Sequence, residues 1–481
     1  MNYTKSITVL SASIILFSFS ASAQIKLPVL FSDNMILQQQ AEVAVWGWDH
    51  SSKNISVYTS WNRKKYTTQC DADGHWKLNI ATPSAGGPFA LEISDGKEIK
   101  KINNVLIGEV WLCSGQSNME MPMKGFRDQP VSGSNDVILK STNKNIRLIK
   151  IPRSSKTTAQ DTAKPTQWQE ADPESVANFS ATGYYFGKLL HQILNNIPVG
   201  LINVSYGGSK IEAWMSAETL KEFTGIETPK ATDSIKSVNQ TPTVLFNGML
   251  HPVIGYGIKG CIWYQGESNY DLPDQYQSLF TAMVKEWRSL WQEGDFPFYF
   301  AQIAPFNYAS LPPYHSGGKY NSAFLRDAQR KSLQTISNSA MVSLMDIGEE
   351  NSIHPMHKEE GGSRFAYLAL AKTYGIKGFA DASPILDTII ITKNIATVKF
   401  LNAPNGLTSF GKELTQFEIS GADKIFYPAT AVISKGTVLV SSPMVKEPVA
   451  VRYAFKDFIK GELFSTDGLP VASFRTDSWN Y

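Results

Sequence analysis

The sequence predicts an α/β core that lies between two β-rich regions, and three observations favour this fold class. From about residue 105, apolar runs of strand length alternate with helical stretches. Before them, residues 24–104 form short alternating runs that are broken by turn pairs such as Asp73-Gly74, a pattern typical of an all-β module. Strand patterns return after about residue 380. A chain of 481 residues is also long enough for two or three folding units.

The first segment has the pattern of a secretory signal peptide. Lys5 precedes an apolar run from Ile7 to Phe19, and Ala21-Ser22-Ala23 provides a small-residue cleavage site. The run is too short to cross a bilayer, which takes a helix of about 20 residues. We therefore predict that residues 1–23 are removed and that the protein is exported to the periplasm or the extracellular space. No integral membrane segment is expected after them.

The middle region supplies the predicted core, one sheet with its covering helices. The clearest helix extends from Asp274 to Trp291, because apolar side chains recur there at steps of three and four residues. Five apolar runs have the length of buried strands: Val110 to Cys113, Val199 to Val204, Gly260 to Tyr264, Phe298 to Ile303 and Met341 to Ile347. Helices packed on such strands predict a parallel sheet in a three-layered core. The predicted units are an all-β domain at 24–104, an α/β domain at 105–380 and a β region at 381–481.

Composition and charge exclude two classes of protein. Apolar residues make up 42% of the chain and charged residues 18%, so the chain is too apolar and too weakly charged for a disordered protein. The 45 Lys and Arg against 43 Asp and Glu give a formal charge of +2, and no basic stretch is dense enough to follow a phosphate backbone. We therefore expect no nucleic-acid partner.

The three cysteines, Cys70, Cys113 and Cys261, allow at most one disulfide. Cys113 and Cys261 each lie in an apolar strand-like run, where cysteine is most often a small buried side chain. We predict this structural role and assign the cysteines no chemistry.

The first candidate for chemistry is Ser117, which follows a predicted strand. The run from Val110 to Cys113 opens into Ser-Gly-Gln-Ser-Asn at 114–118. Ligands of open α/β sheets bind beyond the carboxyl ends of the strands, and Gly115 lets the chain turn sharply there. Ser117 is thus a candidate nucleophile. The alternative is a serine that caps a strand-to-helix turn.

Two further strand ends carry polar groups. Tyr-Gly-Gly-Ser at 206–209 places Gly208 where a backbone N–H could approach a substrate oxygen, although an ordinary tight turn has the same composition. Gln-Gly-Glu-Ser-Asn at 265–269 offers the amide of Gln265 to an oxyanion, and offers Glu267 as a general acid or base or as a binding group. The alternative for this second segment is a polar loop that caps the next helix.

A histidine follows a fourth strand. His354 lies just after the predicted strand end at Ile347 and before a helix, which is where a general base for a serine would be presented. His354 and His357 could also be paired metal ligands, but no carboxylate or cysteine partner stands at ligand spacing. We therefore predict neither a metal nor another cofactor.

Taken in order, Ser117, Gly208, the 265–269 segment and His354-Pro355 resemble the sialate O-acetylesterase family of SGNH (GDSL-like) hydrolases. The resemblance extends over nearly the whole chain after residue 23, and further matching motifs lie at 212–215, 246–249 and 468–477. It implies a flavodoxin-like SGNH core as the catalytic domain, flanked by β-sandwich-like regions. It also implies a serine esterase that removes O-acetyl groups from carbohydrates, above all from sialic acids, with plant xylan or pectin esters as the alternative.

The resemblance also implies a role for each matching residue. Ser117 would be the nucleophile and His354 the base, while the backbone N–H groups of Ser117 and Gly208 and the side chain of Gln265 would form the oxyanion hole. Family members usually carry an aspartate two or three residues before the histidine, where this chain has Asn351 and Ser352. The candidates for orienting the histidine are therefore Asn351, Glu349, Glu350, Glu267 and a backbone carbonyl.

Candidate substrate-binding residues are Asn118, Asn269 and Arg127, the last because an arginine suits an anionic sugar. Two readings from other classes stay open. The 11 tryptophans and the two β regions would suit a non-catalytic carbohydrate-binding protein. Glu267 with Glu349 or Glu350 could instead form the carboxylate pair of a glycosidase.

Overall fold

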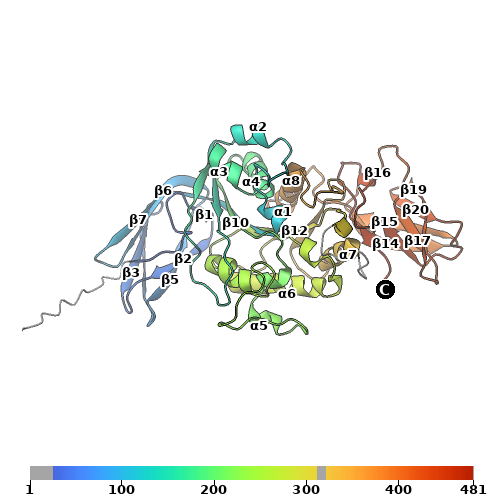
Figure 1. Cartoon of the computed structure of the whole chain (residues 1–481). Coiled ribbons are helices and arrows are strands. Elements are labelled where there is room, and N and C mark those ends of the chain that lie inside the picture. Colours follow the sequence, from blue (N-terminus) through green and yellow to red (C-terminus); the bar gives the residue numbers. More distant parts are fainter. Residues whose placement is uncertain (1–24, 311–320, 480–481) are drawn as a thin grey trace, which may run out of the picture.

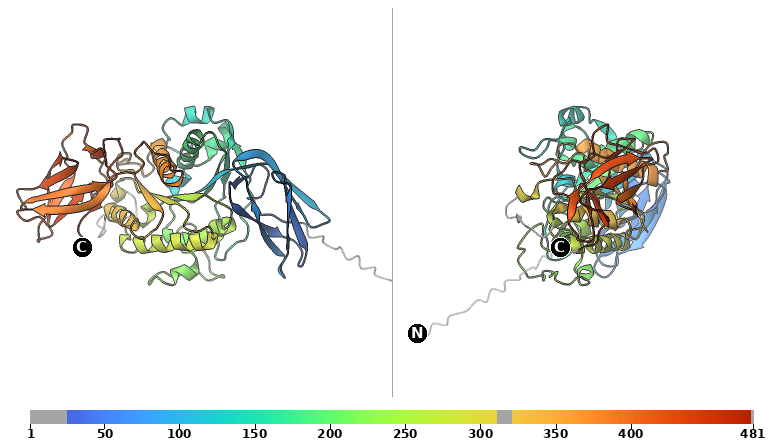
Figure 2. Two further views of the ribbon diagram at one scale, coloured as in Figure 1. Left: turned by 180° about the vertical axis from the view of Figure 1, so that it is seen from behind. Right: turned by 90° about the vertical axis from the view of Figure 1, so that its right-hand side faces the viewer.

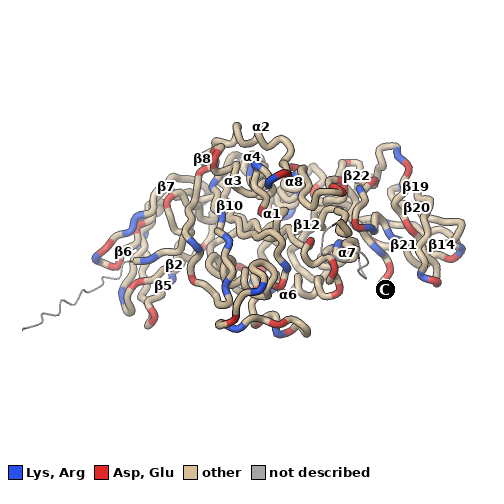
Figure 3. The backbone as a smooth tube through the Cα atoms, in the orientation of Figure 1, with Lys and Arg blue, Asp and Glu red and all other residues tan. Residues whose placement is uncertain are grey.

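The computed structural model describes residues 25–310 and 321–479. The predicted signal peptide at 1–23 lies outside these residues. Figure 1 shows three regions in a row, with a β region at the blue end, a mixed α/β region in the middle and a second β region at the red end. Within the described ranges, no helix is both long and apolar enough to cross a membrane. Figure 3 shows Lys and Arg interspersed with Asp and Glu in all three regions.

The middle region contains a largely parallel sheet, as predicted. Its order is β13-β12-β11-β7-β10-β8-β9, and every neighbouring pair is parallel except β8 with β9. The bounds of these strands are β7 Ile99–Gly115, β8 Asn143–Lys150, β9 Gln169–Ala171, β10 Val199–Ser205, β11 Gly260–Tyr264, β12 Phe298–Gln302 and β13 Ser339–Ser343. All residues of β10, β11 and β12 are buried, because helices cover both faces of the sheet.

The helices form two outer layers. Figures 1 and 2 show α4 and α8 over one face of the sheet and α6 and α7 over the other. The bounds of the α-helices are α1 Ser117–Glu120, α2 Ser134–Leu139, α3 Pro173–Asn178, α4 Ala181–Ile193, α5 Ala217–Leu220, α6 Pro273–Trp291, α7 Ser322–Ser332 and α8 Lys358–Leu368. The helix predicted from Asp274 to Trp291 is α6, and Pro273 supplies its first residue, where a missing N–H costs nothing.

The N-terminal β region is continuous with the core through β7. The first part of β7 pairs with β6, whereas its last residues lie between β10 and β11. This strand therefore crosses the boundary predicted at residues 104 and 105. The remaining strands of the region are β1 Ile36–Gln38, β2 Glu42–Trp48, β3 Asn54–Thr59, β4 Lys64–Gln69, β5 His75–Ala81 and β6 Gly86–Ser94. Among them, β2 and β5 form a separate antiparallel pair.

The C-terminal β region has its own core. Two antiparallel four-stranded sheets, β14-β15-β20-β19 and β18-β17-β21-β23, enclose a hydrophobic cluster that includes Val398, Phe417 and Phe474. The bounds are β14 Ile385–Thr392, β15 Ile395–Leu401, β16 Leu407–Thr408, β17 Phe417–Ser420, β18 Phe426–Pro428, β19 Thr430–Ser434, β20 Thr437–Ser441, β21 Ala450–Tyr453, β22 Phe464–Ser465 and β23 Phe474–Arg475. Arg475 contacts Asp327 of α7 at 3.4 Å, which ties this region to the core.

The cysteines are small core side chains, as predicted. Cys70, Cys113 and Cys261 are all buried and free. Burial raises the pKa of the Cys113 and Cys261 thiols, so neither is an activated nucleophile.

Candidate active site

Four of the predicted site residues, Ser117, Gly208, Glu267 and His354, line one pocket at the carboxyl ends of three neighbouring strands, β10, β7 and β11. Its volume is about 340 Å³, which falls within the usual range for small-molecule sites. The lining residues follow the ends of β7, β8, β10 and β11, and two loops supply Phe126 and His354. The residues that line it are Gln116, Ser117, Phe126, Arg153, Gly207, Gly208, Glu267, Ser268, Ile353 and His354.

Ser117 begins α1 directly after β7. The chain can turn there because Gly115 has a φ of +134° and a Cβ at this position would come within 2.1 Å of the Tyr264 carbonyl oxygen. The Ser117 residue is 9% exposed and lines the pocket. Glycine at 115 therefore allows β7 to lie close to β11 while the chain delivers a hydroxyl to the pocket.

His354 is presented to the same pocket with one ring nitrogen bound and the other open. Its Nδ1 lies 2.5 Å from Oε1 of Gln129, and its Nε2 is buried without a hydrogen-bond partner among the described residues. Because an amide oxygen only accepts, Nδ1 carries the proton and Nε2 keeps its lone pair. The ring of Phe126 packs edge-on against the imidazole, with centroids 5.3 Å apart. Burial, with a smaller contribution from the charge of Lys358, lowers the pKa of His354 to about 4.

The group that orients the histidine is not among those predicted. Asn351 is exposed, and it lines a separate cavity together with Glu349 and Glu350. Glu349 accepts a hydrogen bond from the backbone N–H of Met356, while Glu267 binds elsewhere in the pocket wall. The structure therefore does not support the predicted role of Asn351, since its side chain is exposed and Nδ1 of His354 contacts Gln129 instead. Glu349 and Glu350 line that separate cavity whereas Glu267 lines the pocket of Ser117, which disfavours the carboxylate pair of a glycosidase in one cleft.

Gln129 reaches the histidine from the loop that follows the nucleophile motif. Its backbone N–H donates to the Phe126 carbonyl, which closes a tight turn. Gly125, with a φ of +83°, packs so closely that a Cβ would come within 2.4 Å of the Gln129 carbonyl oxygen. Sequence reasoning missed Gln129 because it searched near His354, 225 residues further along the chain.

Asn118 ties the nucleophile loop to the histidine loop. Its Nδ2 donates to Oε1 of Glu267 at 2.6 Å and to the carbonyl of Ile353 at 3.0 Å. Its Oδ1 accepts from Nζ of Lys358 at 2.5 Å. All polar atoms of this side chain are thus used inside the protein, and Asn118 is 1% exposed. The structure does not support the predicted substrate-binding role and gives Asn118 the role of a positioning residue beside Ser117.

Lys358 and Glu267 are a buried cationic and a buried anionic side chain that both contact Asn118. Burial lowers the pKa of Lys358 to about 7, and the carboxylates of Glu267 and Glu349 oppose that shift. Burial also raises the pKa of Glu267, which the hydrogen bond from Asn118 and the charge of Lys358 partly offset. Asn118 bridges the two side chains, so each buried charge has a nearby opposite charge. The motif search did not single out Lys358.

Gln265 and Asn269 hold the loop after β11 rather than the substrate. The side-chain amide of Gln265 donates to the Ser209 carbonyl at 3.0 Å and to Oδ1 of Asn269 at 2.8 Å, and the residue is fully buried. Asn269 in turn donates to Glu212 at 3.0 Å. Both donor hydrogens of Gln265 are therefore used within the protein. The structure does not support its predicted place in the oxyanion hole, nor a substrate contact from Asn269.

The glycine pair after β10 packs against the nucleophile. A Cβ on Gly207 would lie 3.3 Å from Cβ of Ser117, and the Gly207 N–H donates to Oε2 of Glu120 at 2.7 Å. Gly208 has a φ of +69°, and its carbonyl accepts from Gln240. Within the described residues, neither the Gly208 nor the Ser117 backbone N–H makes a hydrogen bond. Both N–H groups belong to residues that line the pocket.

The arginine at the pocket is Arg153, not Arg127. The Arg127 side chain is 95% exposed, and its ion pair with Asp128 lies outside the pocket. Arg153 lines the pocket, binds both carboxylate oxygens of Glu120 at 2.7 and 2.6 Å, and lies 4.6 Å from the ring centroid of Tyr206. The predicted substrate role of Arg127 is therefore not supported. Sequence reasoning missed Arg153 because it lies in an irregular segment after β8.

Comparisons with known proteins agree on one family. Residues 107–370 match the family described as "Carbohydrate esterase, sialic acid-specific acetylesterase", and this range contains every residue that lines the pocket. The sialate O-acetylesterases of Pongo abelii and Homo sapiens are each 28% identical over 407 residues, covering 77% of this chain and 75% of theirs. The crystal structure of a carbohydrate acetylesterase from Xanthomonas citri is 33% identical, with a TM-score of 0.85, and the match covers 95% of this chain and 100% of that one.

Proposed function

The chain belongs to the sialic acid-specific acetylesterase family of carbohydrate esterases, and from this premise we propose that Ser117 and His354 carry out its reaction. As a member of this family it is a carboxylic ester hydrolase that removes O-acetyl groups from carbohydrates. The observation that supports the proposal is the open Nε2 of His354, a lone pair without a partner in the pocket that Ser117 lines.

The proposed reaction has two steps. Nε2 of His354 takes the proton of the Ser117 hydroxyl as the oxygen attacks the acetyl carbonyl. The tetrahedral intermediate collapses, the sugar oxygen leaves with the proton from His354, and the acetyl group stays on Ser117. Water then gives its proton to His354 as its oxygen attacks the acetyl-serine, and when this second tetrahedral intermediate collapses His354 returns the proton to the Ser117 oxygen and acetate leaves. The low pKa of His354 keeps the ring neutral at neutral pH, so that Nε2 can accept a proton, and it also makes the ring a weaker base than an unperturbed histidine.

The proposed oxyanion hole has two backbone donors. The N–H groups of Ser117 and Gly208 are both without partners within the described residues, and both belong to residues that line the pocket. Removal of one such donor typically lowers turnover by about 10²- to 10³-fold. With the Gln265 amide used elsewhere, these backbone groups stabilise the developing negative charge.

Gln129 is proposed to replace the usual aspartate. Its carbonyl oxygen fixes the tautomer that leaves Nε2 free. A neutral amide stabilises the imidazolium that forms during the reaction less than a carboxylate does. We therefore expect a working esterase with a lower turnover than an aspartate would allow.

For the substrate we propose an O-acetylated sialic acid in preference to acetylated xylan or pectin. Arg153 uses Nε and Nη2 for Glu120, which leaves Nη1 for the carboxylate of an anionic sugar at the pocket. The test is acetate release from O-acetylated N-acetylneuraminic acid and from acetylated xylan, by wild type and by Ser117→Ala. The proposal predicts faster release from the sialic acid and none by the variant. Equal or faster release from xylan would favour the plant polysaccharide.

The remaining sequence predictions complete the proposal. Residues 1–23 act as a signal peptide, and the protein works in the periplasm or the extracellular space. Residues 105–380 form a flavodoxin-like SGNH catalytic domain, with β-sandwich-like regions at 24–104 and 381–481. The parallel sheet with helices on both faces and the two C-terminal sheets around one core support the middle and C-terminal units, whereas β7 passes through the boundary at 104 and 105.

A further inference from the structure

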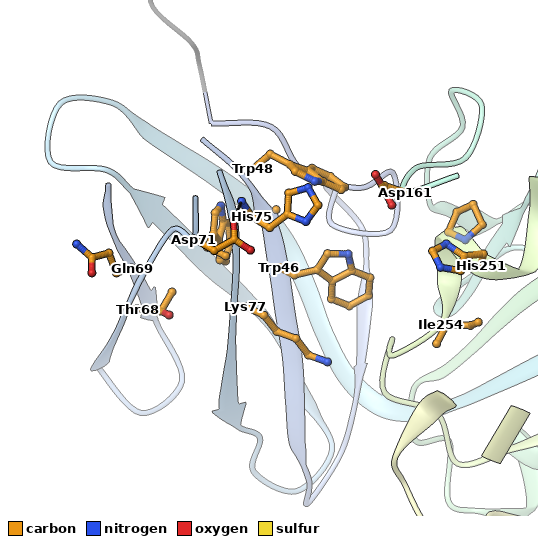
Figure 4. Close-up of a pocket in the computed structure, with 13 residues that line it drawn as sticks. Trp46, Trp48, Thr68, Gln69, Asp71, His75, Lys77, Asp161, His251 and Ile254 are labelled. Carbon is orange, nitrogen blue, oxygen red and sulfur yellow. Dashed lines mark hydrogen bonds between the residues drawn. The ribbon is translucent and has the colours of Figure 1, made fainter. Parts of the chain in front are cut away.

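A second cleft lies between the N-terminal β region and the α/β core, and its residues take no part in the proposed reaction. Its volume is about 430 Å³. Figure 4 shows Trp46, Trp48 and His75 on one side of it, and His251 and Ile254 on the other. The residues that line it are Trp46, Gly47, Trp48, Thr68, Gln69, Asp71, His75, Trp76, Lys77, Asp161, His251, Pro252 and Ile254.

Two tryptophans occupy the outward face of the β2–β5 pair. Residues alternate between the two faces of a strand, and Val43 and Val45 of β2 are buried, which places Trp46 and Trp48 on the opposite face. An outward face of an antiparallel pair is normally polar. Lys77, which lies opposite Trp46 across the pair, fits that rule, whereas the indole side chains of Trp46 and Trp48 are exceptions to it. Both indoles are partly exposed and line the cleft, where an aromatic ring can stack on a ligand.

The indoles are held in place without being fully covered. The ring of Trp46 packs edge-on against Phe31, with centroids 4.7 Å apart. Trp46 is among the side chains packed against the hydrophobic core formed by the described residues, whereas Trp48 is not and packs edge-on against His75 at 5.9 Å. Both tryptophans are half-buried. Each therefore offers part of a rigid apolar ring to the cleft.

Hydrogen-bonding side chains surround these rings. Asp71 is fixed by accepting from the backbone N–H groups of Asp73 and His75. His251 is fixed through its Nδ1, which lies 2.9 Å from the Gln160 carbonyl, so its Nε2 is the nitrogen left for a ligand. Asp161 is exposed on the opposite wall. Flat apolar surface beside carboxylate and imidazole groups matches a sugar ring, which has an apolar C–H face and a rim of hydroxyls.

The charges of the cleft distinguish between sugars. Asp71 and Asp161 bring two carboxylates, while Lys77 brings one ammonium group. The cleft therefore has no excess of positive charge with which to attract an anionic sugar. Its chemistry suits neutral sugar rings, unlike the catalytic pocket with Arg153.

We propose that this cleft is a second glycan-binding site, which holds neutral sugar units of a glycan away from the reacting acetyl group. The segment after β8 lines both sites, since Arg153 borders the catalytic pocket and Asp161 the cleft. They are eight positions apart in the sequence, so their Cα atoms lie at most about 29 Å apart. An oligosaccharide of several units is long enough to approach both. This inference goes beyond the proposed reaction and does not require turnover.

The test is calorimetric titration of the full chain carrying Ser117→Ala, with xylohexaose, cellohexaose and 3′-sialyllactose as probes. The proposal predicts binding of at least one neutral hexasaccharide. Adding Trp48→Ala weakens that binding at least about tenfold, the effect of about 1.4 kcal/mol of lost contact. Trp479→Ala, which removes another half-buried indole in the C-terminal region, leaves it unchanged. Asp161→Ala, on the opposite wall, weakens binding without changing the β2–β5 pair.

Three results would overturn the assignment. The first is that neither neutral hexasaccharide binds at millimolar concentration. The second is that the Trp48→Ala and Asp161→Ala variants bind a neutral hexasaccharide as tightly as the protein without these substitutions. The third is that sialyllactose alone binds and that its binding depends on Trp48. Thermal unfolding shows that each variant is folded. In an otherwise wild-type chain, Trp48→Ala keeps the turnover of p-nitrophenyl acetate, which is too small to reach the cleft. Failure of the esterase proposal would leave the titration unaffected, so the two outcomes are separable.

Discussion

Nδ1 of His354 and Oε1 of Gln129 lie 2.5 Å apart, so an amide binds the ring nitrogen at which a catalytic triad would have a carboxylate. The two residues are 225 positions apart in the sequence. This contact joins the loop after the nucleophile to the loop that carries the proposed base. The other ring nitrogen, Nε2, has no hydrogen-bond partner among the described residues.

Replacement of Gln129 tests this contact. Gln129→Ala removes the acceptor that fixes the tautomer, and we expect kcat to fall by between about 10- and 10⁴-fold, the upper figure being the cost of a wrong tautomer in a serine protease triad. Gln129→Glu supplies a negative charge and should raise kcat above that of wild type. The measurement is steady-state hydrolysis of p-nitrophenyl acetate. Asn351→Ala is the matched control and should leave kcat unchanged. A fall in kcat in Asn351→Ala, with no fall in Gln129→Ala, would restore Asn351 as the orienting residue.

The pH dependence follows from the burial of His354. Its pKa is lowered to about 4, and the base must be neutral to accept a proton. As the pH falls from neutral, kcat/KM should stay level until the pH approaches about 4, and it should decline below that pH. An unperturbed histidine would give the decline near about 6.5. Intrinsic fluorescence at each pH separates titration from unfolding, and a midpoint near the unperturbed value would argue against a desolvated base.

Gln265 should affect stability more than chemistry. Gln265→Leu leaves the Ser209 carbonyl and Asn269 without a buried donor, at a cost of about 1–3 kcal/mol for each unsatisfied group. We expect a lower midpoint of urea unfolding, with kcat of the folded fraction reduced by less than about 10²-fold, the smallest loss typical of an oxyanion donor. Unchanged stability with a larger fall in kcat would instead return Gln265 to the oxyanion hole.

Arg153 and Arg127 form a matched pair of arginines for substrate choice. Arg153→Ala should raise KM for O-acetylated sialic acid at least about tenfold, because an anionic sugar loses its cationic partner. KM for acetylated xylan should change little. Arg127→Ala, at an exposed position, should change neither. Equal effects of Arg153→Ala on both substrates would show that it positions Glu120 and the glycine loop rather than the sugar.

The sequence predicted the elements whose environment is simple. The last part of β7 and the strands β10 and β11 are buried and therefore read as apolar runs, and α6 repeats its apolar face along the helix. Their carboxyl ends are neighbours in the sheet, so Ser117 and Gly208 meet there without any knowledge of the loops. The crossing of β7 between two regions could not be seen, because its first part has polar residues such as Lys100, Lys101 and Asn103, whereas its last part is a buried apolar run, and the change reads as a boundary between two strands.

The rest of the site depends on how loops fold. Gln129 and Arg153 lie in irregular segments, and no local pattern predicts where these segments pass over the sheet. Polar residues inside the motifs were misleading for a related reason. Asn118, Gln265 and Asn269 stand beside reactive groups, but the buried loops need hydrogen-bond partners of their own and use these side chains.

The central claim is that Ser117 and His354 act together as nucleophile and base. The most direct measurement is p-nitrophenol release from p-nitrophenyl acetate by the purified protein, run beside Ser117→Ala and His354→Ala. The account predicts turnover by wild type and loss to the background rate in both variants. Turnover that survives either substitution, or a wild type as inactive as its variants, would contradict it.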